Sequence, residues 1–171
     1  ERLRSQIRSL DQGRRNAADG VSLAQTGEGA LGEVSDILVK LRELAVQAAN
    51  GTLSSNDRAS IGAEAVQTLA ELDRIAAETE FNGIALLDGV SPLAIVTGVE
   101  GEAFALHTFD VSSAALGLST LDLSTATGAA AALASLDSAI DAVSVDQGWA
   151  GAWQRALESR DSIPAYNASA C

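Results

Sequence analysis

The stretch RELAVQAANGTLSSNDRASI, residues 42–61, changes character in its middle. Its first half continues a helical pattern of apolar residues, and Asn50-Gly51 then interrupts it, because both residue types tolerate the left-handed conformation that closes a helix. The Ser-Ser-Asn run at 54–56 offers oxygens to the free N–H groups of a second helix, and Asp57 suits its positive end. The stretch therefore predicts a helical turn, which fits either a hairpin in a globular domain or the outer bend of a rod-shaped subunit.

Upstream of this turn, apolar residues recur at alternating three- and four-residue steps, which is the spacing of one helix face. The series, with Gly27 intervening as a small residue, is Ala24, Leu31, Val34, Leu38, Leu41, Ala45 and Ala48. It predicts a long helix over 1–49 that buries one broad face. At about 1.5 Å per residue such a helix reaches roughly 70 Å, which is long for a globular domain.

Downstream, the pattern predicts a second helix over 57–80, a β-hairpin with loops over 84–128 and a C-terminal helix over 129–163 that Pro164 ends. The short connection at 50–56 favours an antiparallel return of the second helix along the first. The strands of the hairpin are expected to join near Glu100-Gly101. The fold class is therefore mainly α: one domain over 1–171, an elongated bundle of two N-terminal helices and one C-terminal helix with a β-hairpin region.

Composition excludes several classes of function. The 171 residues are 47% hydrophobic but only 4% aromatic, with no Met, which suits closely packed helices. A net charge of -12 disfavours binding to nucleic acid and to anionic membranes. We find no apolar run of membrane-spanning length and expect no membrane insertion. The one cysteine, Cys171, provides neither an intrachain disulfide nor a cysteine metal site.

Candidate catalytic chemistry is sparse. His107 is the one histidine, and without a second ligand, a nucleophile or an orienting group it is expected to be a partly buried strand residue. We predict no catalytic residue, no metal site and no cofactor. Trp149 and Trp153 lie four residues apart on the C-terminal helix and share a face. That face is either packed against the neighbouring helix or a docking patch for a partner.

Three phrases of the sequence carry a resemblance to a known family. DGVSLAQTGEGAL at 19–31, LRELAVQAANGT at 41–52 and EFNG at 80–83 resemble the rod domain of bacterial flagellin. The resemblance runs from about residue 7 to 118 and resumes less cleanly from about 132 to 159. It implies two N-terminal helices, a β-hairpin and one C-terminal helix, packed as a rod in the flagellar filament. The turn at Asn50-Gly51 is then the outer bend of the rod.

The chain also departs from the family pattern. In AGAWQRALES, residues 150–159, Arg155-Ala156 stands where the family has Asn-Arg. Flagellins extend at both ends into coiled-coil segments, termed D0, and many carry variable outer domains after the hairpin. This chain resembles the rod domain, D1, without either. We therefore expect the 171-residue chain alone to stay monomeric or weakly associated.

The resemblance implies a structural subunit of the bacterial flagellar filament, which packs laterally against other flagellin subunits and serves motility. It also implies an extracellular location, in the flagellum, reached by export without a cleaved signal peptide. The alternatives are a hook-filament junction protein, which shares the rod helices, and a binding module recognised by a host innate-immune receptor.

That receptor is the Toll-like receptor specific for flagellin, and the family's contact motif can be placed on this chain. The candidate surface for receptor or subunit contact is Lys40, Arg42, Glu43, Leu44, Gln47, Ala70 and Arg74. Lys40 stands at the first Arg of the family motif, and Ala70 stands where a Glu faces it from the second helix. Lys lacks the planar, multi-donor guanidinium and Ala lacks any charge, so receptor binding is predicted to be weak.

Overall fold

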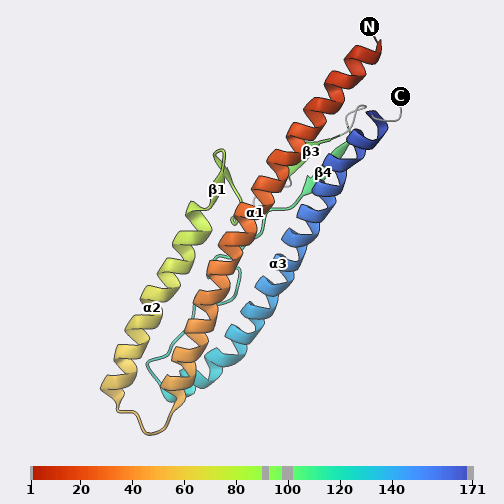
Figure 1. The fold of residues 1–171 in the computed structure, drawn as a ribbon. Coiled ribbons are helices and arrows are strands. Elements are labelled where there is room, and N and C mark those ends of the chain that lie inside the picture. The colour runs from red at the N-terminus through yellow and green to blue at the C-terminus, as the bar shows by residue number, and fades with distance from the viewer. Residues whose placement is uncertain (1, 90–92, 98–101, 169–171) are drawn as a thin grey trace.

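The structure is a computed structural model that describes residues 2–89, 93–97 and 102–168. Within these residues, three long helices lie side by side along one axis (Figure 1). They are α1 (Arg2–Ala49), α2 (Ser55–Glu78) and α3 (Ala126–Ala168). Two antiparallel strand pairs complete the described elements: β1 (Glu80–Phe81) with β2 (Ile84–Ala85), and β3 (Leu93–Val96) with β4 (Ala103–Leu106). The predicted fold class, an elongated and mainly helical bundle, is confirmed.

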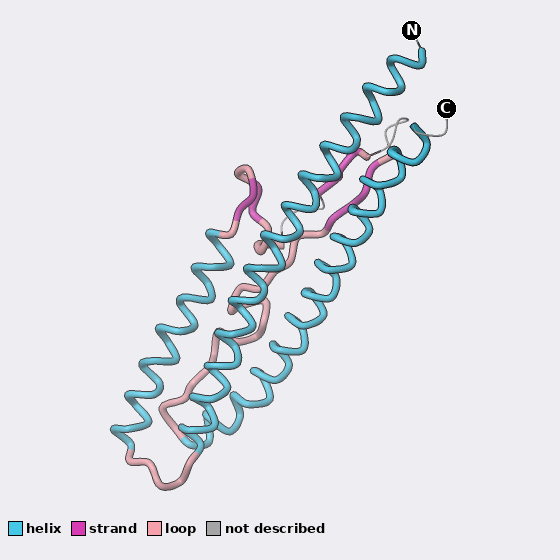
Figure 2. Tube along the Cα trace, in the orientation of Figure 1, coloured by secondary structure: helices cyan, strands magenta, loops and turns pink. Residues whose placement is uncertain are grey.

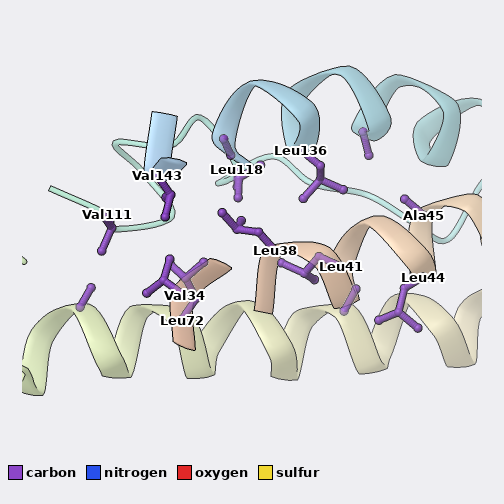
Figure 3. Close-up of a cluster of buried hydrophobic side chains, with 14 of the residues drawn as sticks. Val34, Leu38, Leu41, Leu44, Ala45, Leu72, Val111, Leu118, Leu136 and Val143 are labelled. Carbon is purple, nitrogen blue, oxygen red and sulfur yellow. The ribbon is translucent and has the colours of Figure 1, made fainter. Parts of the chain in front are cut away.

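Helix α1 occupies the middle of the bundle, with α2 along one side and α3 along the other (Figure 1). The apolar series predicted from the sequence is its buried face: Leu38 and Leu41 are fully buried, as are Val34 and Ala45. From α3, Leu136 and Val143 point into the same core, which Leu72 of α2 closes (Figure 3). The start of α1 and the end of α3 lie at the same end of the bundle because the two helices run antiparallel (Figure 1).

Helix α1 ends at Ala49, as expected, but not through a left-handed residue. Neither Asn50 nor Gly51 has a positive φ. Instead, Arg58 of α2 donates from Nε to the carbonyl of Ala48 and from Nη2 to the carbonyl of Asn50, both at 2.9 Å. Arg58 therefore satisfies one of the last carbonyl groups of α1, which a helix end leaves without intrahelical donors, and also the carbonyl of the residue that follows the helix.

Helix α2 is displaced toward the N-terminus relative to the predicted range of 57–80. Ser54 is its N-cap, and a reciprocal pair of hydrogen bonds with Asp57 forms a capping box. The helix ends at Glu78 because Thr79 leaves the helical conformation and its N–H and hydroxyl both donate to the Ile75 carbonyl. Glu80 belongs to β1 rather than to the helix.

The strand pairs lie beside the upper half of α1. Asn82 and Gly83, with φ of 51° and 77°, form the tight turn between β1 and β2 that the Asn-Gly signal predicts. Strand β3 pairs with β4 in the register Leu93↔Leu106. Asn16 of α1 donates from Nδ2 to the Val96 carbonyl at 2.8 Å, which ties β3 to the helix. The turn predicted near Glu100-Gly101 lies outside the described residues.

The segment from 107 to 125 is non-helical chain that runs between β4 and the start of α3 (Figure 2). Its apolar residues nevertheless belong to the core, with Val111 and Leu118 fully buried (Figure 3). Ser113 fixes its path by donating from the backbone N–H at 2.7 Å and from the hydroxyl at 2.8 Å to the carboxylate of Asp73 on α2. The segment therefore joins all three helices in one core.

Helix α3 is longer at both ends than the predicted range of 129–163. It begins at Ala126 because Thr125 caps it, the Thr125 hydroxyl accepting from the Gly128 N–H at 3.0 Å. The prediction that Pro164 ends the helix was wrong, since α3 continues to Ala168. The φ of proline is compatible with a helix, so the chain can continue through Pro164, although the missing N–H and the clash of a proline ring with the carbonyl four residues earlier weaken a helix at such a point.

The expectation that the chain has no apolar run of membrane-spanning length was wrong for α3. By length and composition alone, Ala126–Arg160 is apolar enough to cross a bilayer. This is weak support for a membrane span, because a helix that packs in the core of a bundle passes the same test. Much of the apolar content is alanine, and the Ala132, Leu136, Ala139 and Val143 positions are buried in the bundle.

Candidate interaction surfaces

The receptor or subunit surface predicted on α1 is divided among different sides of that helix. Lys40, Glu43 and Gln47 are exposed and share one face, because they follow each other at three- and four-residue steps. Lys40 Nζ lies 3.0 Å from Glu64 Oε1 on α2, so its charge is directed toward that helix. Leu44 is 7% exposed and belongs to the core between the helices.

Arg42 lies on the opposite side of α1 and faces α3. Its Nε donates to Asp137 Oδ1 at 2.6 Å, and this hydrogen bond, together with the charge of Asp137, raises the pKa of Arg42. The two basic residues that α1 contributes to the predicted surface therefore form ion pairs with different helices. Of the exposed group on the other side of α1, Lys40 contacts α2 through Glu64.

The two predicted residues on α2 are both exposed but chemically different. Arg74 forms ion pairs with Glu71 and Glu78, both at 2.5 Å, and the hydrogen bond to Glu71 is the larger cause of the raised pKa of Arg74. Ala70 carries no polar group and lies six residues beyond Glu64, about 9 Å along the helix axis. The acidic residue that meets Lys40 in this chain is thus Glu64.

A second surface, which the sequence indicated only through its tryptophans, lies between β4 and α3. The Trp153 ring, 9% exposed, stacks on Phe109 with centroids 5.0 Å apart and 19° between the ring planes. Trp149, one turn earlier, is 57% exposed. Each interpretation of this face therefore applies to one of the two residues. Trp153 packs against Phe109, whereas Trp149 remains available to a partner.

His107 differs from its predicted position. It follows the last residue of β4 and is exposed, with its ring centroid 6.4 Å from that of Trp153. The alternation of β4 explains this, because buried Leu106 points inward and the next residue points outward. No cluster of three or more His, Cys, Asp or Glu side chains that could hold a metal ion occurs among the described residues.

These features define a class of protein before any comparison. Three extended helices share one long hydrophobic core, ion pairs join α1 to α2 and to α3 at the surface, and the elongated shape places side chains on long lateral faces. Such an arrangement is typical of an assembly subunit.

Comparisons with known proteins agree with this class. The family model described as the bacterial flagellin N-terminal helical region matches residues 1–91. Flagellin from Salmonella muenchen is 46% identical over 123 residues, which are 71% of this chain and 24% of that protein. Flagellin from Halalkalibacterium halodurans is 41% identical over 162 residues, covering 92% of this chain and 60% of that protein. The chain thus spans between about a quarter and three fifths of the length of these relatives.

Solved structures show the same similarity. The crystal structure of Bacillus cereus flagellin matches with a TM-score of 0.79 and 31% identity, over 92% of this chain and 95% of that one. A putative flagellar hook-associated protein from Vibrio parahaemolyticus has a TM-score of 0.78 at 16% identity, over 96% of this chain and 90% of that one, which shows the fold alone.

The chain belongs to the flagellin family. The resemblance carried by its sequence phrases is therefore confirmed. Flagellins are structural proteins, so family membership also confirms that the chain is not an enzyme.

Proposed function

We propose that this chain is the rod domain of a flagellar filament subunit, a single D1-like unit over 1–171 that packs laterally against other flagellin subunits. The observation that carries the proposal is the match of more than half of the chain to the flagellin model, together with identities of 41 to 46% to flagellins. The same role implies an extracellular location and export without a cleaved signal peptide.

The outer face of α2 supports lateral packing. Small apolar residues follow it at helical spacing and are exposed: Ala59, Ala63, Val66, Ala70 and Ala77, here called the α2 outer stripe. The largest side chain of the stripe, Val66, is 60% exposed. Small side chains let a neighbouring backbone approach closely, and burial of this stripe between subunits would remove apolar surface from water.

Electron microscopy of the full-length gene product tests the proposal. We expect long filaments, and their absence under polymerising conditions would contradict it. Within the same protein, Val66→Glu introduces a charge into the α2 outer stripe and should strongly reduce filament formation. Gln67→Glu adds the same charge at a neighbouring exposed position and should leave it intact. Equal circular dichroism spectra establish that both variants are folded, and normal filaments from Val66→Glu would exclude the stripe as a contact.

The alternative of a hook-filament junction protein makes a different prediction. A junction protein is needed in few copies and should not form long filaments by itself. The fold is compatible with both roles, since the hook-associated protein from Vibrio parahaemolyticus has a similar fold. The flagellin identities of 41 to 46% favour the filament subunit.

As a second function, we propose that the host Toll-like receptor recognises this chain only weakly. Lys40 provides a single ammonium where the family motif has a guanidinium, and its charge is already paired with Glu64. Ala70 is exposed and uncharged at the position of the motif's acidic partner. Interface anchors contribute about 2 kcal/mol or more each, so two losses correspond to roughly a thousandfold weaker binding.

The test compares receptor affinity of this chain with that of a Lys40→Arg, Ala70→Glu double variant. We expect a large gain in the double variant. A Lys40→Arg, Ala59→Glu variant carries the same changes in charge but places the carboxylate elsewhere on α2, and it should gain little. Nanomolar affinity of the unmodified chain, or equal affinities of both double variants, would refute the proposal.

A further inference from the structure

A cleft of about 670 Å³ lies between β4 and α3, where the chain's few aromatic residues gather. Both tryptophans and two of the three phenylalanines line it, although aromatic residues make up only 4% of the sequence. Its side chains include Phe104, His107, Phe109, Asp110, Asp146, Trp149 and Trp153. Aromatic rings and carboxylates therefore face the same space, and the lining contains no Lys or Arg among the described residues.

The aromatic part of the cleft is held in place by packing. The stack of Trp153 on Phe109 forms a base that is anchored in the bundle, because Trp153 is 9% exposed. Trp149 extends from the next turn of α3 and is 57% exposed, so its ring face is available to a ligand. Tryptophan has the most favourable ring for attracting a cation.

The two carboxylates give the cleft its charge. Ser112 donates to Asp110 Oδ1 from its N–H at 3.2 Å and from its hydroxyl at 2.8 Å, which fixes the orientation of that carboxylate. Asp146 is half-buried on α3 and accepts no hydrogen bond from the described residues. Burial raises the pKa of Asp146, which is the behaviour of a carboxylate that lacks a counter-ion.

The rim of the cleft already holds one cation from the chain itself. The Arg160 guanidinium carbon lies 5.1 Å from the centroid of the Phe104 ring, within the range of a cation–π contact. The Arg160 side chain is also fixed by donating from Nη1 to the Thr97 hydroxyl at 3.1 Å. The contact shows that a planar cation fits against one of the rings that line the cleft, that of Phe104.

We propose that the cleft between β4 and α3 binds an organic cation, a guanidinium or alkylated ammonium group. The exposed face of Trp149 supplies the cation–π contact, and Asp146 supplies the unpaired negative charge beside it. This site is separate from the α2 outer stripe, which lies on a different helix, so the proposal does not depend on filament assembly.

The indole N–H signals of Trp149 and Trp153 report on the cleft directly, since the chain contains no other tryptophan. We would titrate the ¹⁵N-labelled chain with tetramethylammonium and with ethylguanidinium at neutral pH, using sodium chloride at equal ionic strength as the reference. We expect saturable shifts of both indole signals with either organic cation. Shifts no larger than those with sodium would overturn the proposal, and so would equal shifts with neutral methyl glucoside.

Variants locate the binding contribution. Trp149→Leu removes an exposed ring and should weaken binding about fivefold, as read from the Trp153 indole signal. Asp146→Asn should weaken it by a similar factor. Asp141→Asn, at an exposed position on α3 outside the cleft, changes the net charge equally and should leave the affinity unchanged. Equal losses of affinity in Asp146→Asn and Asp141→Asn would mean that the net charge of the chain, and not a binding site in the cleft, attracts the cation. That result would refute the proposal.

Discussion

Gly13 lies where α1 approaches the backbone that follows β3, and replacing it with Ala should not give the stability that Gly→Ala normally adds within a helix. A Cβ at this position would lie 2.5 Å from the Thr97 carbonyl oxygen and 3.0 Å from its carbonyl carbon. Both atoms belong to the backbone, so relief requires a shift of β3 or of α1 rather than a side-chain rotation. Gly29 provides the matched control on the same helix, because a Cβ added there would meet nothing within 4 Å beyond its own helix backbone and its chain neighbours.

The two substitutions should differ in their effect on the free energy of unfolding. Gly→Ala within a helix gains about 1 kcal/mol from helix propensity, and Gly29→Ala should retain that gain. At Gly13, overpacking costs about 1 to 3 kcal/mol, which cancels or exceeds the gain. Gly20→Ala should be intermediate, because its Cβ would meet the ends of Ile95 and Leu157 side chains, which can move.

Thermal unfolding followed by circular dichroism measures the difference. For a chain of this length, 1 kcal/mol corresponds to about 2 to 4 °C in Tm. We expect a Tm above wild type for Gly29→Ala and at or below wild type for Gly13→Ala. If both variants gained stability equally, the close approach of α1 to the chain after β3 would be refuted.

Three further predictions concern the stability of the bundle. Leu41→Ala, at a fully buried position, should lower the free energy of unfolding in urea by about 2 to 5 kcal/mol. An unchanged midpoint would mean that the buried face of α1 is a different one. Ser54→Ala should cost about 1 kcal/mol by removing the N-cap of α2. The hydroxyl and the backbone N–H of Ser54 both donate to Asp57 and lower its pKa, so the stability that Asp57 contributes is present above its unfolded pKa and is lost as pH falls through the lower folded pKa. Ser54→Ala keeps the N–H and loses the hydroxyl, so this loss at low pH should be smaller in the variant. Gly148 and Gly151 weaken α3 locally by about 1 kcal/mol each relative to Ala, so amide hydrogen exchange should be faster around them than in the glycine-free part of α1 at 33–49, and equal protection would contradict this.

Much of the candidate site could not be assigned from the sequence. The family motif drew attention to Lys40 and Arg42 together. It could not show that they pair with different helices, since their partners Glu64 and Asp137 come from distant parts of the chain. The tryptophan pair was visible as a shared helix face. Its neighbours in the cleft, Phe109 and Asp110, follow β4 and were not connected with it by any local pattern.

The sequence by itself determined the helices and the turn at residue 50, because helical periodicity repeats every 3.6 residues and is a local property of the chain. The spacing of Leu31, Leu38 and Ala45 is enough to identify the buried face of α1. Only the tertiary structure decided that the non-helical segment around Val111 and Leu118 completes the core. It alone also decided that Trp153 packs while Trp149 stays exposed, because burial depends on which distant segment covers each side chain.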